Sequence, residues 1–313
     1  RSYIQGRSRI MKAIGIILAG GNNNRMKELT AKRAVPALPV AGSFRSIDFA
    51  LSSMSNSHIQ PVAVLTQYNA RSLNEHLSSS KWWNFGRKQG GLFLFTPTVT
   101  ADNSDWYRGT ADAMYQNIDF LKRRHEPYVI ISSGDCVYKL DFNRVLDFHI
   151  EKKSDITVVC KDMMYNDDVS RFGVVRMDEE SRITEFDEKP IEASSNTIST
   201  GIYVIRRRQL IELLEAAAEE NSFDFVNDIL VRYKNVKKIY GYKINSYWNN
   251  IADIDAYFKT NMDFLRPDIR SYFFREEPTI CSKVDDLPPA KFNPGSDISN
   301  RLVSSGCIPL TAT

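Results

Sequence analysis

The stretch that decides the fold runs from Ile14 to Pro36 and reads IGIILAGGNNNRMKELTAKRAVP. It opens with an apolar, β-branched run, which is typical of a strand covered on both faces. Ala19, Gly20 and Gly21 follow at once. Such small residues let a ligand approach the backbone, where successive N–H groups can bind an anion. The stretch therefore predicts a strand followed by a phosphate-binding loop, and an ordinary strand-to-loop turn is the alternative.

Basic residues follow this loop. Arg25 and the pair Lys32-Arg33 are suited to meeting phosphate oxygens. The loop has neither the GxGxxG pattern of a dinucleotide site nor the GKS or GKT ending of a P-loop. Val35 stands where a charged side chain would help phosphate chemistry, which raises the question of whether the protein is an enzyme at all.

The composition only broadly limits the class of protein and its partners. The chain has 313 residues and a formal net charge of +3, so neither nucleic acid nor an anionic membrane is expected as a partner. No apolar run approaches the ~20 residues of a membrane span. Residues 1–10 precede a methionine and are expected to be a cloning remnant. The widely spaced cysteines lack metal-ligand spacing and indicate free thiols in the cytoplasm: Cys136, Cys160, Cys281 and Cys307.

Strand-like and helix-like runs alternate along residues 11–265. We predict a helix after an N-cap at Thr110 and another around Leu210–Ala217, since apolar residues recur there at helical spacing. This alternation predicts an α/β, Rossmann-like domain with a mostly parallel sheet. The predicted strands, besides the one after Ile14, are 62–66, 128–132, 156–159, 173–176, 183–186, 202–205 and 238–242.

Ligands of such sheets bind beyond the carboxyl ends of the strands, where Gly20 and Asp135 are both expected. Asp135 follows VIISSG, and a carboxylate there suits Mg²⁺ with substrate phosphates. A turn residue or a helix N-cap is the equal alternative. Glu188 and Lys189 suit a sugar hydroxyl and a sugar phosphate, or else form a surface charge pair before a proline.

Two further segments suit a ligand site, and the last part of the chain differs from both. The residues from Trp106 to Thr110 offer aromatic rings and a helix N-terminus that could hold an anion, or a packed helix entry. Residues 82–105 have no clear period and predict a functional loop. We expect a linker at 266–296 and, at 297–313, the start of a β-helix that the chain cuts short.

Together these motifs resemble one family, ADP-glucose pyrophosphorylase (glucose-1-phosphate adenylyltransferase). The resemblance covers roughly residues 11–310, and the 106–113 and 44–52 segments are its most specific parts. In chain order the motifs are LAGG (18–21), KRAVPA (32–37), FRSIDFALS (44–52), TQY (66–68), WYRGTADA (106–113), SGDCVYKLD (133–141), FGV (172–174), EKP (188–190) and TGIYV (200–204).

The resemblance implies a GT-A-type nucleotidyltransferase domain, a left-handed β-helix and a tetrameric assembly. It also implies Mg²⁺-dependent joining of ATP and glucose 1-phosphate into ADP-glucose for glycogen or starch synthesis. Arg25 would neutralise the ATP phosphates, and Asp135 would hold the metal. The nucleotide would lie against Leu18, Ala19, Gly20, Gly21, Gln67, Gly109 and Thr110. Glucose 1-phosphate would lie against Tyr107, Gly173, Glu188, Lys189 and Ser199.

Three departures from the family pattern concern charge and loop geometry. Asn23 lies in a loop that is usually richer in glycine, and we expect it to keep the turn through a left-handed backbone while crowding a phosphate. Val35 replaces a phosphate-facing lysine, and Asn250 replaces the second metal-binding aspartate. Both also have ordinary explanations, since valine suits an extended segment before proline and Asn250 could cap a helix starting at Ile251.

The losses at Val35 and Asn250 affect the same step, because transfer of this kind depends on positioned positive charge and metal clamps. The chain therefore resembles most the regulatory, catalytically weak subunit that some bacteria pair with an active homologous subunit in a heterotetramer, with Mg²⁺ binding weakened. An active adenylyltransferase is the alternative. A pyrophosphorylase for another sugar or nucleotide is a more distant third.

Overall fold

The computed structural model describes residues 12–86, 91–99, 105–164 and 167–308. The apolar run after Met11 forms β1 (Ala13–Ala19), as the sequence predicts. It lies inside a large sheet, and it pairs in parallel with β4 (Pro61–Thr66) on one side and with β6 (Tyr128–Ser133) on the other. Burial on both faces explains why this strand is apolar throughout.

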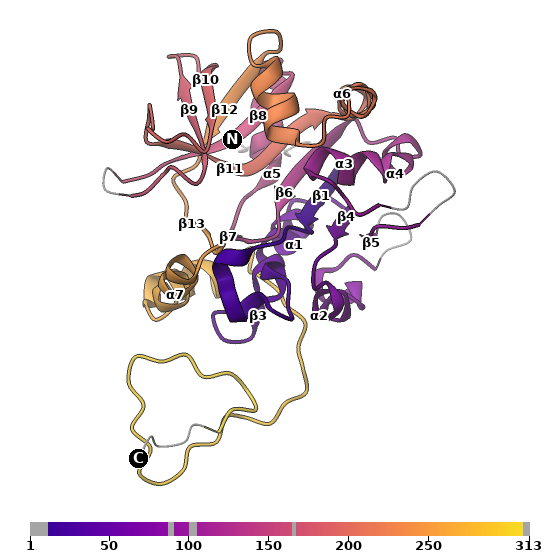
Figure 1. Ribbon diagram of the computed structural model, residues 1–313. Helices are drawn as coiled ribbons and strands as arrows, with labels where there is room; N and C mark the ends of the chain where they lie inside the picture. Colours follow the sequence, from indigo (N-terminus) through magenta and orange to yellow (C-terminus); the bar gives the residue numbers. More distant parts are fainter. Residues whose placement is uncertain (1–11, 87–90, 100–104, 165–166, 309–313) are drawn as a thin grey trace, which may run out of the picture.

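Nine strands of the described residues form the main sheet, which confirms the predicted α/β class (Figure 1). The part nearest β1 is parallel, and antiparallel pairs gather around the long strand β11 (Thr197–Arg206), so the sheet is mixed. The other strands of the sheet are β5 (Gly91–Phe95), β8 (Ile156–Asp162), β9 (Gly173–Met177), β10 (Ile183–Glu188) and β12 (Ile239–Lys243).

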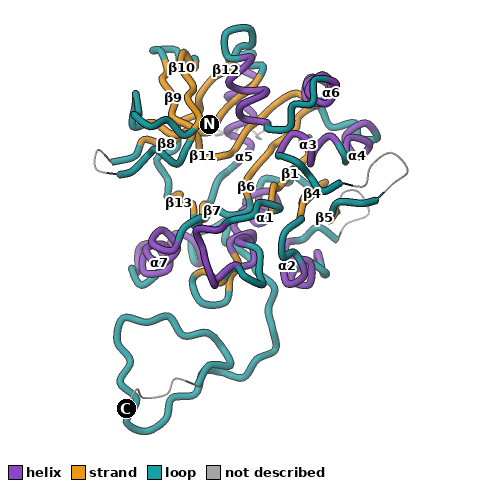
Figure 2. The backbone as a smooth tube through the Cα atoms, viewed as in Figure 1, coloured by secondary structure: helices purple, strands orange, loops and turns teal. Residues whose placement is uncertain are grey.

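Helices cover both faces of this sheet (Figure 2). Alternate side chains of β1 enter different clusters, with Ile17 on one face and Ile16 on the other. Helices α1 (Ser46–Asn56), α2 (Arg71–His76) and α5 (Phe142–Glu151) pack with Ile17, and α3 (Thr110–Tyr115) and α6 (Arg207–Glu219) pack with Ile16. Burial of these apolar faces is the main stabilising term of the fold.

A third apolar cluster lies below the sheet and joins the two ends of the domain. It contains Met26 and Val35 from the segment after β1. It also contains Phe264, the C-cap of α7 (Ile254–Asp263), and Phe273 from the last helix, α8 (Pro267–Phe274). Two short ladders complete the fold: β2 (Pro39–Val40) with β3 (Phe44–Arg45), and β7 (Cys136–Tyr138) with β13 (Trp248–Asn250).

The helix predicted after Thr110 is divided. It comprises α3 and α4 (Ile118–Lys122), and Gly109 rather than Thr110 is the N-cap of α3. The Thr110 hydroxyl instead accepts the N–H of Phe225, at 2.8 Å. The prediction of an N-cap at Thr110 is therefore wrong by one residue, because a chain segment more than a hundred residues away takes up the threonine oxygen.

The structure also differs from the sequence prediction in residues 82–105. The stretch 82–105 is not one irregular loop, since it includes strand β5, and residues 87–90 and 100–104 lie outside the described residues. Residues 281–308 form neither helix nor strand, and much of this segment leaves the main body as a long loop (Figure 1). Cys281 still bonds to Ser52, and Leu302 packs against the third apolar cluster. The β-helix start at 297–313 stays a prediction, and residues 309–313 and 1–10 lie outside the described part.

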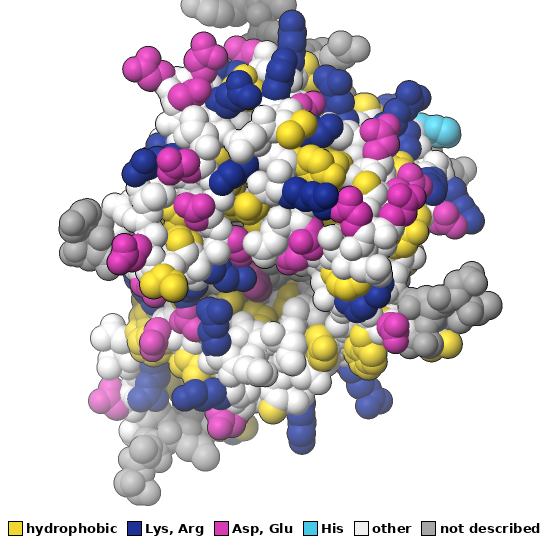
Figure 3. All heavy atoms as spheres, turned by 45° about the horizontal axis from the view of Figure 1, so that its top comes forward, with side chains coloured by type: hydrophobic (Ala, Val, Ile, Leu, Met, Phe, Trp, Pro, Cys, Tyr) yellow, Lys and Arg dark blue, Asp and Glu magenta, His cyan; other side chains and the backbone are white. Residues whose placement is uncertain are grey.

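The surface is consistent with the modest net charge. On the face turned forward in Figure 3, basic and acidic side chains are interspersed. In the described part of the chain, no helix is both long and apolar enough to cross a bilayer. The four cysteines are free thiols, two of them buried.

His149 makes the stability of the fold depend on pH. It lies on the buried face of α5, and its Nδ1 is 2.8 Å from the Thr157 hydroxyl. Burial and the nearby Arg206 charge lower its pKa from 6.5 to about 4. The unfolded chain therefore binds an extra proton between these pH values. We expect the free energy of unfolding to fall by about 3 kcal/mol as pH drops from 7 to 4. Urea unfolding at several pH values measures this, and His149→Gln should flatten the dependence; an equally steep fall in the variant would refute the assignment.

Candidate active site

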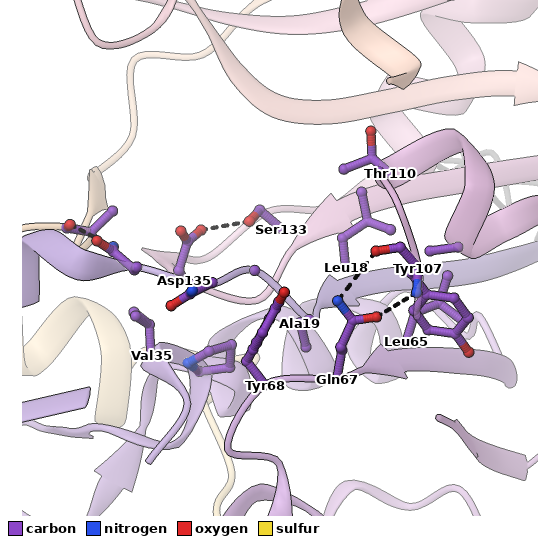
Figure 4. Close-up of a pocket in the computed structure, with 18 of the residues that line it drawn as sticks. Leu18, Ala19, Val35, Leu65, Gln67, Tyr68, Tyr107, Thr110, Ser133 and Asp135 are labelled. Atoms are coloured by element: carbon purple, nitrogen blue, oxygen red, sulfur yellow. Dashed lines mark hydrogen bonds between the residues drawn. The ribbon is translucent and has the colours of Figure 1, made fainter. Parts of the chain in front are cut away.

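A pocket of about 680 Å³ opens at the carboxyl ends of β1, β4 and β6, the edge at which the sequence predicts a ligand site (Figure 4). It brings together most of the predicted site residues from segments far apart in the chain. The predicted residues that line it are Leu18, Ala19, Gly20, Gly21, Arg25, Gln67, Tyr107, Gly109, Thr110, Asp135 and Lys189, and Val35 and Asn250 line it as well.

The loop after β1 is shaped by Asn23 in a way that the sequence did not indicate. Asn23 has φ −123° and ψ 97°, so its backbone is extended and the predicted left-handed conformation is wrong. Its side chain keeps the turn instead. The Oδ1 atom accepts the N–H of Arg25 at 2.9 Å, and Nδ2 donates to the carbonyl of Ala252 at 2.6 Å. Because the side-chain amide donates one hydrogen bond and accepts another, it can fix the loop without a glycine.

Gln67 fixes the opposite wall. Its side-chain amide makes two bonds to the backbone of Tyr107: Nε2 donates to the carbonyl at 3.2 Å, and Oε1 accepts the N–H at 2.6 Å (Figure 4). Next to this clamp, the rings of Tyr68 and Trp106 stack with centroids 5.6 Å apart, and both are largely exposed. Exposed stacked rings at a pocket rim are suited to packing against a flat ligand.

The amides of Ala111 and Asp112 at the N-terminus of α3 are already bonded, which favours the packed helix entry over an anion site. The carbonyl of Phe223 accepts the N–H of Ala111 at 2.8 Å and the N–H of Asp112 at 3.2 Å. Gly109 is required here, because a Cβ at this position would lie 2.4 Å from that same carbonyl oxygen. Backbone from another segment therefore occupies the place where a phosphate would have to bind.

Asp135 lies at the end of β6 with its carboxylate held in place. The hydroxyl of Ser133 donates to Asp135 Oδ1 at 2.5 Å (Figure 4), and the backbone carbonyl accepts the N–H of Ile251 at 2.9 Å. The neighbouring Cys136 is fully buried, and burial followed by the Asp135 charge raises the pKa of its thiol well above the usual value. Cys136 is thus a protonated, inert thiol at neutral pH.

Asn250 pairs directly with the segment that carries Asp135, since β13 and β7 are antiparallel neighbours. Its Oδ1 accepts the N–H of Ala252 at 3.0 Å, and its Nδ2 contacts the Cys136 sulfur at 3.4 Å. Helix α7 begins only at Ile254, and Asp253 is its N-cap, so the alternative that Asn250 caps a helix from Ile251 is wrong. The amide holds the local turn.

Val35 is almost fully buried although it lines the pocket. It belongs to a 3₁₀ turn (Val35–Ala37), and it packs in the third apolar cluster with Met26 and Ile251. Its carbonyl accepts the N–H of Leu38 at 2.9 Å. Valine therefore contributes to packing at this position, and it brings no charge to the pocket.

Of the residues predicted to hold glucose 1-phosphate, Tyr107 and Lys189 line the pocket. Lys189 Nζ lies 3.1 Å from Glu188 Oε1, and Glu188 is opposite Gly173 in the β9–β10 ladder. A Cβ on Gly173 would lie 2.9 Å from Glu188 Oε2, so glycine lets this carboxylate approach. Ser199 is buried and donates its hydroxyl to the Tyr203 oxygen at 3.3 Å. Gly173, Glu188 and Ser199 do not line the pocket.

Sequence reasoning missed several lining residues, among them Tyr68, Arg108, Arg171 and Phe172. Tyr68 lies inside the TQY motif and Phe172 inside FGV, so these two could have been named from the quoted segments. Arg171 gave no comparable signal, because an arginine in a polar turn is ordinary surface composition. Its position in the pocket follows only from the fold.

Comparisons with known proteins agree with this geometry. The nucleotidyl transferase family model matches residues 14–266. The chain is 39% identical over 300 residues to a glucose-1-phosphate adenylyltransferase of Clostridium acetobutylicum, which covers 95% of this chain and 79% of the relative. Proteins of the same name from Pseudothermotoga lettingae (38% over 299 residues, 95% and 71%) and Geobacillus stearothermophilus (35% over 300, 95% and 77%) are similar. The chain thus belongs to the nucleotidyl transferases, and within them to the glucose-1-phosphate adenylyltransferase family.

Nucleotidyl transferases of this family generally use Mg²⁺. One or two carboxylates together with substrate phosphates make the usual protein site for this ion. Asp135 offers one carboxylate at the pocket, and the oxygen of Asn250 already accepts a backbone N–H. These donors thus fit a magnesium ion held mainly by Asp135 and phosphate oxygens. Asn250, at the position of the family's second metal-binding aspartate, contributes no charge.

Proposed function

We propose that this chain is a regulatory subunit of ADP-glucose synthesis. It binds ATP and glucose 1-phosphate, or ADP-glucose, in the pocket at the carboxyl ends of β1, β4 and β6, and it transfers the adenylyl group weakly or not at all. It works in the cytoplasm within a heterotetramer, where its ligand state changes the affinity of a homologous catalytic subunit for substrate or effector.

The proposal rests on Val35 and Asn250, which stand where the family pattern has a lysine and an aspartate. Val35 packs in an apolar cluster, and Asn250 is committed to a turn through its Oδ1 atom. The binding side of the pocket keeps its residues, including Gln67, Tyr107 and Lys189. A pocket of this kind favours binding of substrate over stabilisation of the transition state.

In this site Arg25 neutralises the phosphates of ATP, and the glycine loop admits the nucleotide. Lys189, held by Glu188, meets the sugar phosphate. Asp135 would hold Mg²⁺, which supplies positive charge against the developing negative charge on the phosphates. With a single carboxylate there, we expect weakened metal binding.

An active adenylyltransferase is the second candidate, and one observation favours it. Asp135 is positioned by Ser133 at the end of β6, and one carboxylate can suffice for Mg²⁺ when substrate phosphates complete its shell. In that case the chain alone would make ADP-glucose at an ordinary enzymatic rate.

Assay of the chain alone and with a catalytic family member separates these candidates. We expect ADP-glucose formation by the chain alone to be about 10² to 10³-fold below that of the catalytic member, because one preorganised stabiliser is typically worth that much. We also expect co-expression to shift the substrate affinity of the catalytic member. A full rate from this chain alone would establish the active enzyme instead.

A further inference from the structure

Arg171 is a second cation at the end of the pocket that holds Asp135 and Asn250. It lies in the turn before β9, with its guanidinium over the ring of Phe172 at 4.8 Å. Its Nη1 pairs with Oδ2 of Asp253, and Asp253 Oδ1 accepts the N–H of Ala256 at 2.7 Å. One aspartate therefore caps α7 and fixes the arginine at the same time.

Arg25 approaches the same region from the loop after β1. Asn23 ties that loop to Ala252, one residue from the Asp253 that anchors Arg171. The two arginines are thus positioned against one short segment, β13 to α7. Both arginines line the same pocket. Burial lowers the pKa of the Arg171 guanidinium, the charge of Asp168 opposes this shift, and the charge of Arg25 adds to it. Arg171 stays charged at neutral pH.

The other basic side chains of the pocket already form ion pairs within the protein. Arg108 pairs with Asp112 at 3.1 Å, and Lys189 pairs with Glu188 at 3.1 Å. For Arg25 the described part of the chain offers no carboxylate within salt-bridge distance. Arg171 uses one nitrogen for Asp253, and a guanidinium has five N–H donors, so further donors remain for a ligand. Asp168 and Asp167 also act on Arg171, so an anion would be held by the guanidinium donors that stay free rather than by a large net charge.

We infer that Arg25 and Arg171 form a two-guanidinium site for the phosphate groups of the nucleotide, so that nucleotide binding does not depend on a divalent cation. The inference rests on the proposed function for the identity of the ligand. Arginine binds phosphate oxygens bidentately, and such charge-assisted bonds are strongest where water is excluded. Arg171 thereby supplies positive charge from a different element to the pocket that Val35 also lines.

Calorimetric titration of the full chain with ATP tests this, once with Mg²⁺ and once with EDTA. We expect the dissociation constant of the parent chain to change less than about threefold on removing the metal. Arg171→Gln should weaken ATP binding about tenfold or more in EDTA, the value for a lost charge-assisted hydrogen bond. Arg176→Gln is the matched control, since Arg176 is exposed on β9 and lies outside the pocket lining.

A second variant guards against a folding defect. Asp253→Asn keeps an oxygen for the α7 cap but removes the charge that anchors Arg171, and we expect an intermediate loss of ATP affinity with an unchanged melting transition. Loss of ATP binding by the parent chain in EDTA would overturn the inference, and so would an Arg171→Gln chain that binds like Arg176→Gln; both leave the proposed function standing. A chain that binds no ATP with or without Mg²⁺ would overturn both.

Discussion

The double variant Val35→Lys, Asn250→Asp is expected to make ADP-glucose about 10² to 10³-fold faster than the parent chain. Each change restores a charge at a position that lines the pocket. A lysine at 35 can run its aliphatic stem along the apolar cluster and present its amine to the phosphates. An aspartate at 250 adds a carboxylate beside Asp135 for the metal. The rate is measured as ADP-glucose formed from ATP and glucose 1-phosphate.

The single variants are the controls for this experiment. We expect the rate of ADP-glucose formation to rise less in each single variant than in the double variant. A cation and a metal clamp at one centre act together, so their effects on the rate need not add. Two neighbouring carboxylates also repel each other without a metal. Asn250→Asp should therefore gain more thermal stability from Mg²⁺ than the parent chain does. If both variants fold and bind ATP yet the rate stays unchanged, the two replacements are not the cause of weak catalysis.

Gly109→Ala is expected to destabilise the fold by about 3 kcal/mol and to disrupt the pocket. The added methyl would lie 2.4 Å from the Phe223 carbonyl oxygen and 2.8 Å from its carbon. This collision cannot be relieved by a rotamer change, because both contacts are backbone. The Phe223 segment would have to move away from α3, and the bonds from Ala111 and Asp112 would be lost with it. Chemical denaturation measures the change.

Gly86→Ala is the matched control for Gly109, since a Cβ there meets no atom within 4 Å. We expect its free energy of unfolding to stay within about 0.5 kcal/mol of the parent value. Equal stability of the two variants would mean that the Phe223 segment is free to shift. In that case the rigid entry to α3 described above would be wrong.

The sequence allowed the fold to be predicted where pattern and burial agree. The run after Met11 could only be a doubly covered strand, and it forms β1. Gly20 and Asp135 were expected at one sheet edge, and both line the pocket. These predictions succeed because strand burial and the parallel crossover are local consequences of hydrophobic pattern.

The finer features depended on partners distant in the chain. The carbonyl of Phe223 fills the N-terminus of α3, which no local pattern around Thr110 could reveal. Asn23 keeps its loop through a bond to Ala252 rather than through backbone conformation. Arg171 enters the site because the turn before β9 is packed against the start of α7.

The bond between Asn23 and Ala252 joins residues 229 positions apart, which has a consequence for the order in which the molecule is made. During synthesis the loop after β1 emerges from the ribosome long before its acceptor exists. The same holds for Arg171, whose anchor Asp253 comes later still. Domains fold as units as the chain lengthens. The pocket is therefore finished only when translation has passed Asp253, and a nascent chain that stalls earlier carries the sheet without a ligand site.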